Sequence, residues 1–593
     1  MSHKLFSFDT ESTGLMHHLG DRMFSYSWAD RNLRSKVYRV DGKKQDRIRN
    51  RKRLRRFLLG EDNRIVMHHA KHDLTACDYE LGQVLVEGDV NFEDTMIEMK
   101  LLRSDLPTFA LKPLTHLLCG YPMEDEKAVK SAARGVGYQR VPENVMQRYQ
   151  VGDVERTMLL HLFAQRKWRD ATPEMRKLYE TEKRLIWATK KMEYRGIRIS
   201  PQKTGELIRG LEKGMERSLA KLEKMAGRYV NPVGKQAANF LFNDLGMPVM
   251  AKTEKTGSPR AKKEDLLALR ETNPHPALDE ILKYRSWQRG RTTLQSYLDL
   301  SRDGLLHPTI NTYGAETGRE SISNPNAHNV EKSGGVGNPF PVPARKVFIC
   351  KVGYVNFYID YRGIELRIIA HFAGDEKLTQ MFRDGVNPHD YMADFWYGDR
   401  YRKAKSPKVK QTLYDAAKNT NYAIPYGANA LKVAQILQLP FDSVQSKWAE
   451  YEDTFPGFVS LQRRTRRQVK EQGYVTTLRG RRIYVQRNKP YVGVNYRIQG
   501  SGADILKEAQ VRVDDLLSQR TGNAAGIILP VHDEIGGEYP RERGMRKLWP
   551  LLQDVCRLMV DFPEMSIPLE VECKLTSTSW EEAEKIDLEQ LVA

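Results

Sequence analysis

The sequence lacks any apolar stretch long enough to span a bilayer, which excludes a membrane-spanning helix. It also lacks a secretory signal, because the first residues place Asp9 and Glu11 inside an apolar run and show no order of charged, apolar and then small residues. Cysteine is scarce, and no paired spacing suggests a disulfide framework or a structural zinc site among Cys77, Cys119, Cys350, Cys556 and Cys573. We therefore expect a protein of the reducing cytoplasm that has no membrane partner.

Length and charge narrow the possibilities further. At 593 residues the chain is too long for one hydrophobic core and should divide into three or four domains. Its 95 Lys and Arg against 76 Asp and Glu give a net charge of +19, which favours nucleic acid as the partner through counterion release. A basic globular protein without nucleic-acid function stays an alternative on this observation, because charge names no reaction.

Acidic residues follow short apolar runs near the N-terminus. Residues 5–8 have the pattern of a buried strand that leads into Asp9 and Glu11, which lie two positions apart and so face the same side. A second run leads to Asp73, and a third segment carries Asp153. Four carboxylates without matching local cations repel one another unless a divalent ion neutralises them, and oxygen ligands suit Mg²⁺ or Mn²⁺. The pattern predicts a two-metal hydrolytic site.

Tyr149 lies four residues before Asp153, on the same helix face, where it can orient an attacking water. The three segments resemble the DEDD exonucleases of the subclass with tyrosine in the third motif. This resemblance implies a ribonuclease-H-like 3'-5' proofreading exonuclease domain at residues 1–170. His69 departs from the family pattern, which usually has asparagine there, whereas the pattern is matched by His68, Lys71 and Asp73.

The middle of the chain has two kinds of segment. Residues 170–300 are rich in Lys, Arg, Glu and Leu at helical spacing, which predicts long amphipathic helices. Within them, residues 252–263 are polar and basic and suit a tip that touches duplex phosphates. Residues 317–323 are turn-rich, and we expect them to be too polar for a core.

A second set of carboxylates follows strand-like runs in the C-terminal half. Residues 354–359 lead into Asp360, and residues 525–531 lead through His532 into Asp533 and Glu534. Pairing of these two strands would set Asp360 beside Asp533. Two such carboxylates can hold two Mg²⁺ ions roughly 3.5 to 4 Å apart, which activates a hydroxyl and binds a triphosphate.

Lys418, Tyr422 and Tyr426 lie between these strands at i, i+4 and i+8 of one predicted helix. A lysine there can neutralise triphosphate oxygens, and an aromatic ring can stack on a base. Pro425 should remove the hydrogen bond to the carbonyl of Asn421 and bend this helix just before Tyr426.

These segments resemble motifs A, B and C of the family A DNA polymerases, the DNA polymerase I type, over about half the chain. The resemblance implies template-directed addition of dNTPs to a primer 3'-OH by two-metal phosphoryl transfer. It implies that Asp360 and Asp533 bind the metals, that Glu534 supports them, and that Lys418 faces the triphosphate. It also implies contacts with DNA or nucleotide for Arg319 and His532 at the primer end, Glu365 and Tyr426 over the sugar, His389 on a phosphate, and Asn495 and Gln499 in the minor groove.

The resemblance also covers differences from the family. It places Tyr422 where the residue sets discrimination against dideoxynucleotides, and we expect poor discrimination. Tyr414 stands where the family usually has an arginine, so one triphosphate contact is either missing or comes from Lys408 or Lys410. The family's Leu-Gln-Asn is replaced by Ala327-His328-Asn329.

Two alternatives stay open. A single-subunit RNA polymerase uses similar metals but must admit a 2'-hydroxyl, and the bulky Glu365 favours its exclusion. A nuclease-only or structural DNA-binding protein with an inert polymerase half is the other, and the departures at positions 69, 414 and 425 leave room for it. The complete sets of carboxylates favour a working polymerase.

We expect a multidomain protein of α/β and α+β class, in which the exonuclease domain precedes a right hand. The divisions are thumb and connecting helices at 171–330, first palm part at 331–395, fingers at 396–490, and second palm part with the C-terminus at 491–593. Each active site should use two Mg²⁺ ions, with Mn²⁺ as an alternative. We expect no 5'-nuclease domain before Met1, and phage replicative polymerases of the resembled family often begin directly with the proofreading domain, so we expect a bacteriophage replication enzyme in the host cytoplasm. We also expect a monomer. Its partners would be primer-template DNA and dNTPs, with helicase, primase and single-strand-binding protein as further candidates.

Overall fold

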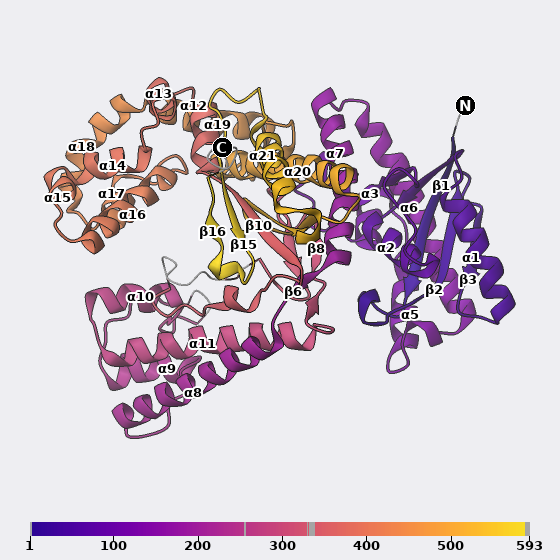
Figure 1. The fold of residues 1–593 in the computed structure, drawn as a ribbon, viewed down its shortest axis with the longest axis horizontal. Helices are drawn as coiled ribbons and strands as arrows, with labels where there is room; N and C mark the ends of the chain where they lie inside the picture. Colours follow the sequence, from indigo (N-terminus) through magenta and orange to yellow (C-terminus); the bar gives the residue numbers. More distant parts are fainter. Residues whose placement is uncertain (1–2, 254–255, 329, 331–337, 588–593) are drawn as a thin grey trace.

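The computed structural model describes residues 3–253, 256–328, 330 and 338–587. Figure 1 shows an N-terminal α/β unit, a helical arm, a second sheet and a set of outer helices beyond it. Asn329 and part of the predicted basic tip at 252–263 lie outside the described residues. None of the helices in the described ranges is long and apolar enough to cross a membrane.

The N-terminal unit is built on a mixed sheet with the strand order β3-β2-β1-β4-β5. β1 pairs antiparallel with β2 and parallel with β4. The strands are β1 (Lys4–Ser12), β2 (Met23–Asp30), β3 (Ser35–Arg39), β4 (Asn63–Met67) and β5 (Phe92–Asp94), and the helices are α1 (Lys44–Leu58), α2 (Ala70–Leu81), α3 (Thr95–Leu102), α4 (Leu111–Cys119), α5 (Glu124–Ala133) and α6 (Glu143–Trp168). The α/β class expected for this part is confirmed.

The helical arm follows. Before it, α7 (Pro173–Arg195) packs against α2 and α3 of the N-terminal unit and against α20 (Val492–Thr521) (Figure 1). The helices of the arm are α8 (Pro201–Ala226), α9 (Lys235–Asn239), α10 (Lys263–Thr272) and α11 (Pro276–Asp299). Thr172 and Ser200 cap α7 and α8 with side-chain oxygens, and each helix has proline in its first turn. α8 packs along α11, and their apolar faces form a core with α9 and α10. The predicted long amphipathic helices are therefore confirmed.

The second sheet is antiparallel, with the order β13-β14-β10-β15-β16. Its strands are β10 (Tyr354–Tyr361), β13 (Gly526–Val531), β14 (Glu534–Pro540), β15 (Val571–Thr576) and β16 (Glu584–Lys585). It shares one large core with α12 (Ile364–Ala373), α13 (Glu376–Arg383), α19 (Pro456–Gln472), α20 (Val492–Thr521) and α21 (Met545–Val560). Short pairs β6–β7 (Ile197–Arg198, Leu305–Leu306), β8–β9 (Thr309–Asn311, Ser321–Ser323) and β11–β12 (Tyr474–Thr476, Arg482–Tyr484) join the parts.

The outer helices correct the prediction for Pro425. They are α14 (Pro388–Tyr397), α15 (Asp399–Arg402), α16 (Pro407–Ala423), α17 (Ala430–Leu437) and α18 (Phe441–Thr454). α16 ends two residues before Pro425, so the predicted bend inside a helix is wrong, and the proline lies in the turn that follows. Proline has no N–H to continue the hydrogen-bond ladder, which fits a helix end at this place. Tyr426 keeps a backbone hydrogen bond of 3.3 Å to the carbonyl of Tyr422.

The segment 317–323 is less exposed than its polarity suggests. Thr317 and Glu320 are buried, so the prediction that this segment is too polar for a core is wrong for these two residues. Glu320 accepts a hydrogen bond of 2.6 Å from Nε2 of Gln510, which lies on α20. A polar group can be buried when it finds such a partner.

Candidate active sites

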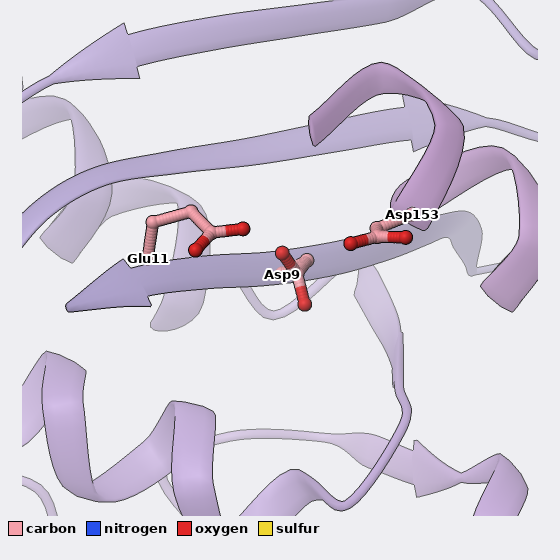
Figure 2. Close-up of side chains that lie close together, drawn as sticks. All are labelled: Asp9, Glu11 and Asp153. Atoms are coloured by element: carbon pink, nitrogen blue, oxygen red, sulfur yellow. The ribbon is translucent and has the colours of Figure 1, made fainter. Parts of the chain in front are cut away.

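The first site lies on the sheet of the N-terminal unit. Alternation along β1 puts Asp9 and Glu11 on one face, and α6 brings Asp153 opposite them, as Figure 2 shows. One oxygen from each of the three carboxylates lies within 4.8 Å of the others. The structure thus brings together residues that are more than 140 positions apart in the sequence.

Burial disfavours the charged forms of these acids. It raises the pKa of Glu11 to about 8, with the charge of Asp153 as a further cause, and it raises the pKa values of Asp9 and Asp153. Oδ2 of Asp9 is buried without a hydrogen-bond partner among the described residues. A set of close, buried carboxylate oxygens with an unpartnered member fits a hard divalent cation such as Mg²⁺ or Mn²⁺.

Asp73 lies next to this trio but is held differently. Its Oδ1 accepts hydrogen bonds from the backbone N–H of Thr10 at 2.9 Å and from the Thr10 hydroxyl at 2.7 Å. Burial raises its pKa to about 8, and its negative charge raises the pKa of Asp9. Asp73, the fourth predicted carboxylate, is therefore held beside the site by hydrogen bonds from Thr10, the residue between Asp9 and Glu11.

Cations lie beside the acids, so the sequence premise of carboxylates without matching cations is wrong. Nζ of Lys112, on α4, lies 2.7 Å from Oδ2 of Asp153 and 3.8 Å from the ring centroid of Tyr149. Arg156 donates to the other Asp153 oxygen at 3.1 Å. Arg156 lies three residues after Asp153 on the same helix, so the helical spacing could have predicted this contact. Lys112 lies on a separate helix, and no local sequence pattern connects it with Asp153.

The second site is the tip of the β13–β14 hairpin. Val531 pairs with Glu534, which leaves His532 and Asp533 as a two-residue turn, and His532 has the positive φ of +58° that such turns require. Asp360 stands opposite Glu534 in the adjacent strand β10, and the backbone N–H of Tyr361 donates to the carbonyl of Asp533 at 3.2 Å. The predicted pairing of the strand at 354–359 with the strand at 525–531 is wrong, because β14 lies between β10 and β13 in the sheet. Asp360 nevertheless lies beside Asp533, because the hairpin turn brings Asp533 to the end of β10.

The electrostatics of the second site parallel those of the first. Burial and the charge of Asp533 raise the pKa of Asp360 to about 7, while burial and the charge of Asp360 raise that of Glu534 to about 7. Burial also raises the pKa of Asp533. Oε1 of Glu534 is buried and, within the described part of the chain, has no hydrogen-bond partner. These carboxylates also fit divalent cations.

A cavity of about 420 Å³ opens beside the hairpin tip, lined in part by Arg319, Glu365, Tyr422 and Asp533. Glu365 is fixed at its edge by two partners, because Arg319 donates to Oε1 at 2.5 Å and the Tyr426 hydroxyl donates to Oε2 at 2.9 Å. Tyr426 therefore meets Glu365 from beyond the end of α16. The expected contact of Arg319 with a primer is untested, and here its partner is Glu365.

α16 carries a lysine without an acidic partner in the described part of the chain. Lys418 is exposed and forms no ion pair with any residue in the described ranges. His389 contacts Asn421 through Nδ1 at 2.7 Å and lies 5.7 Å from the Tyr422 ring. Burial, together with the charge of Lys418, lowers the pKa of His389 to about 4, so it is neutral at neutral pH. Tyr414 accepts a hydrogen bond of 3.1 Å from Asn387.

His328 is a further residue to which the sequence analysis assigned no role. Its ring stacks on that of His532 at 5.0 Å, and its Nε2 accepts from the His532 backbone N–H at 3.1 Å. The only signal in the sequence was its departure from the family's glutamine. Asn495 and Gln499 are half-buried on α20 and make no hydrogen bond with another described side chain.

The fold has two separate carboxylate sites, one on the sheet of the N-terminal unit and one at the second sheet. A model of 3'-5' exonuclease matches residues 1–167, and a model of DNA polymerase family A matches residues 202–582. The chain belongs to DNA polymerase family A. This identification agrees with the resemblance found in the sequence motifs.

The relatives are bacterial enzymes. The chain is 32% identical over 426 residues to "DNA polymerase I, thermostable" of Thermus aquaticus, covering 66% of this chain and 48% of that protein. It is 28% identical over 542 residues to DNA polymerase I of Pseudomonas aeruginosa, covering 87% and 56%. The chain thus spans about half the length of these relatives.

A solved structure shares the whole fold. It is the POL domain of Pol1 from M. smegmatis in complex with DNA primer-template and dNTP, with a TM-score of 0.81, 24% identity, and coverage of 98% of this chain and 96% of that one. The expected succession of an exonuclease unit and a polymerase unit is confirmed as a fold.

Proposed function

We propose that the chain is a template-directed DNA polymerase that adds dNTPs to a primer 3'-OH and proofreads with a 3'-5' exonuclease. The observation that carries this proposal is the presence of two separate carboxylate clusters, each within the part of the chain that matches the corresponding family model. When bound to these clusters, Mg²⁺ or Mn²⁺ would supply Lewis-acid stabilisation of charge on the reacting oxygens.

In the polymerase site, Asp360 and Asp533 would hold the metal ions, with Glu534 behind them. The free ammonium of Lys418 would bind triphosphate oxygens, and the Tyr422 ring would stack on the incoming base. Glu365 stands at the edge of the cavity, held by two hydrogen bonds. A rigid carboxylate there would exclude a 2'-hydroxyl, which favours DNA over RNA synthesis.

In the exonuclease site, Asp9, Glu11 and Asp153 would bind metal directly, and Asp73 would act beside Asp9. Tyr149 would orient the attacking water. Lys112 contacts both Asp153 and the Tyr149 ring, so it would hold the tyrosine in place while it offsets carboxylate charge. The polymer cleaved would be the 3' end of the same primer.

The wider setting is also a proposal. α7 and the helical arm suit the thumb and connecting helices at 171–330, the second sheet suits the palm at 331–395 and 491–593, and the outer helices suit the fingers at 396–490. The remaining DNA contacts, at Arg319, His389, His532, Asn495 and Gln499, are proposed from the family motifs. A bacteriophage replisome with helicase, primase and single-strand-binding protein stays a prediction without support from the relatives named above, which are bacterial.

The test is primer extension with all four dNTPs and Mg²⁺ on one 5'-labelled primer-template. Asp533→Ala should abolish extension but still shorten the primer, and Asp9→Ala should extend without shortening. Asp442→Ala removes an exposed carboxylate on α18, outside both clusters, and should behave like the wild type. If the wild-type protein only degrades the primer at every dNTP concentration, the polymerase assignment fails and a nuclease takes its place.

A further inference from the structure

Most of the excess positive charge of the chain lies in one short segment. Residues 31–56 contain 13 Lys and Arg and two Asp, an excess of 11 charges out of the +19 of the whole protein. None of the site residues described above lies in this segment. The charge that marks the chain as a polyanion binder is therefore concentrated outside both candidate active sites.

The segment folds into an edge strand and a helix on the outer side of the N-terminal unit. It contains β3, which is at one end of the sheet order, and α1, which buries Asn50, Leu54 and Leu58 against the core. Figure 1 shows α1 and β3 at the side of the N-terminal unit that faces away from the second sheet. The two active sites and this segment thus lie on different parts of the molecule.

The exposed side of α1 is a basic stripe. Its exposed basic residues, which we call the outer basic face, are Lys44, Arg47, Lys52, Arg55 and Arg56. Two other arginines of the helix have acidic partners, Arg49 with Asp46 and Arg51 with Glu80. No member of the outer basic face forms an ion pair with a residue in the described ranges.

Repulsion within this stripe lowers the stability of α1. Lys52 lies three and four positions before Arg55 and Arg56, and like charges at these spacings destabilise an isolated helix. A solvated helix face commonly mixes both signs, which removes this repulsion. An external anion that lies along the stripe would neutralise it.

We propose that the outer basic face binds the phosphate backbone of duplex DNA, outside both active sites and without reading base sequence. The choice of DNA rests on the proposed function, because a polymerase meets this polyanion at high local concentration. The duplex is favoured over a single strand because the face offers no exposed aromatic ring on which bases can stack, and the one aromatic residue of α1, Phe57, is half-buried against Phe6 and Trp28. A helix of 15 residues is about 22 Å long, enough to follow several phosphates of one strand.

The test compares two triple variants of the full chain with equal loss of charge. Lys52→Gln with Arg55→Gln and Arg56→Gln removes part of the outer basic face, while Arg166→Gln with Lys167→Gln and Arg169→Gln removes three exposed charges at the end of α6. The probe is a covalently closed DNA dumbbell of about 20 base pairs, which has no 3' end, in EDTA so that no strand is cut. Binding through other parts of the protein is common to all the proteins compared.

The dependence of binding on salt should separate the variants. Loss of three phosphate contacts should lower the slope of log K against log salt concentration by about 2.7 and weaken binding at low salt, whereas the α6 variant should match the wild type. Equal slopes and affinities for the two triple variants would overturn the proposal. Polyglutamate serves as a second probe, which represents an acidic protein. If the α1 triple variant loses binding to polyglutamate but keeps its binding to the dumbbell, the partner would be an acidic protein and the proposal would be overturned.

Two controls keep this test independent of the proposed function and of folding. Extension of a short primer-template should be equal in all three proteins, so a failure of the polymerase assignment would appear in that assay and leave the dumbbell result readable. Glutamine is a good helix former and removes like-charge repulsion, so the melting temperature of the α1 variant should not fall. If α1 nevertheless unfolds, Lys52→Gln with Arg56→Gln gives the same comparison with two charges, and a slope unchanged there also overturns the proposal.

Discussion

Nζ of Lys112 lies 2.7 Å from Oδ2 of Asp153, in a contact where both side chains are buried. The same ammonium lies over the ring of Tyr149, 3.8 Å from its centroid. Lys112 therefore links a carboxylate that would bind metal with the tyrosine that would orient water. Its positive charge also lowers the pKa values of Asp9 and Glu11 against the effect of burial.

Lys112→Met should destabilise the metal-free protein. The change leaves Asp153 with Arg156 as its remaining cation and removes a buried charged hydrogen bond. The free energy of unfolding should therefore fall by about 1 to 3 kcal/mol at mildly alkaline pH. Urea unfolding in EDTA measures this loss, and added Mn²⁺ should restore part of it. Lys130→Met, which breaks an exposed ion pair with Glu126 on α5, should change the midpoint little. Equal midpoints for the two variants would show that the Lys112–Asp153 contact contributes nothing to stability.

Stabilisation by metal should depend on pH in the N-terminal site. The folded-state pKa of Glu11 is raised from 4.5 to about 8 and that of Asp73 from 3.8 to about 8. Raised carboxylate pKa values mean that their contribution to stability is present below the unfolded-state values and is lost as the pH rises through about 8. A divalent ion at this site would bind the deprotonated carboxylates and would reverse this loss.

The increase in melting temperature on adding Mn²⁺ should therefore be small at about pH 5 and large at about pH 8. Glu11→Gln should reduce the increase at the higher pH, and the part that it removes belongs to this site rather than to Asp360 and Asp533. A Mn²⁺ effect of the same size at both pH values would contradict the raised pKa values.

The local pattern of the sequence was enough to find the acids and most of the elements that carry them. Strands β10 and β13 were predicted because short apolar runs end in acidic residues, and both strands are present in the structure. The return strand β14, which pairs with both of them, was not predicted. The pairing of Asp9 with Glu11 on one strand face follows from the period of two residues along a strand. The family of the chain was also found from motif order, and the family models agree with it.

Contacts between distant segments were not predictable in this way. Lys112 comes from a helix 41 positions before Asp153, and His328 stacks on a ring 204 positions later. The position of Pro425 was known, but only the structure shows that α16 stops before it. Such contacts depend on how helices pack against the sheets, and a periodic pattern carries no information about which side chains then meet.

Tyr426→Phe should weaken the exclusion of ribonucleotides. Glu365 would keep Arg319 but lose the hydroxyl that donates to Oε2 at 2.9 Å, so its carboxylate would be less fixed at the edge of the cavity. A hydrogen bond to a charged group contributes about 1.5 to 3 kcal/mol, so the ratio of ribonucleotide to deoxyribonucleotide incorporation should rise about tenfold or more. Single-nucleotide insertion kinetics with each nucleotide type give this ratio.

Tyr422→Phe is the matched control, because it removes a hydroxyl one turn earlier that forms no hydrogen bond with Glu365 in the described part of the chain. Its ribonucleotide ratio should stay near that of the wild type, although it should increase discrimination against dideoxynucleotides. The same rise in ribonucleotide ratio for both variants would mean that the Tyr426–Glu365 contact has no special role.

A buried ionic network joins α7 to the second sheet unit. Glu182, on α7, accepts through Oε1 from Arg481 and, at 2.7 Å, from Lys507 on α20, and all three side chains are almost fully buried. Asp504 holds the other side of Arg481 at 2.8 Å. Burial alone would raise the pKa of Glu182, but the charges of Lys507 and Arg481 outweigh it, and the pKa is lowered.

Glu182→Gln should therefore be strongly destabilising, because it leaves buried cations short of one negative charge, and a loss of about 3 to 5 kcal/mol is expected. A lowered carboxylate pKa stabilises the fold above the unfolded-state value of 4.5, so the difference from wild type should narrow as the pH falls below it. The urea midpoint at neutral and acid pH measures both effects. Asp399→Asn, which breaks an exposed pair with Lys403, should change little at either pH. If Glu182→Gln lowers the urea midpoint as little as Asp399→Asn does, the charges of this network contribute no net stability to the fold.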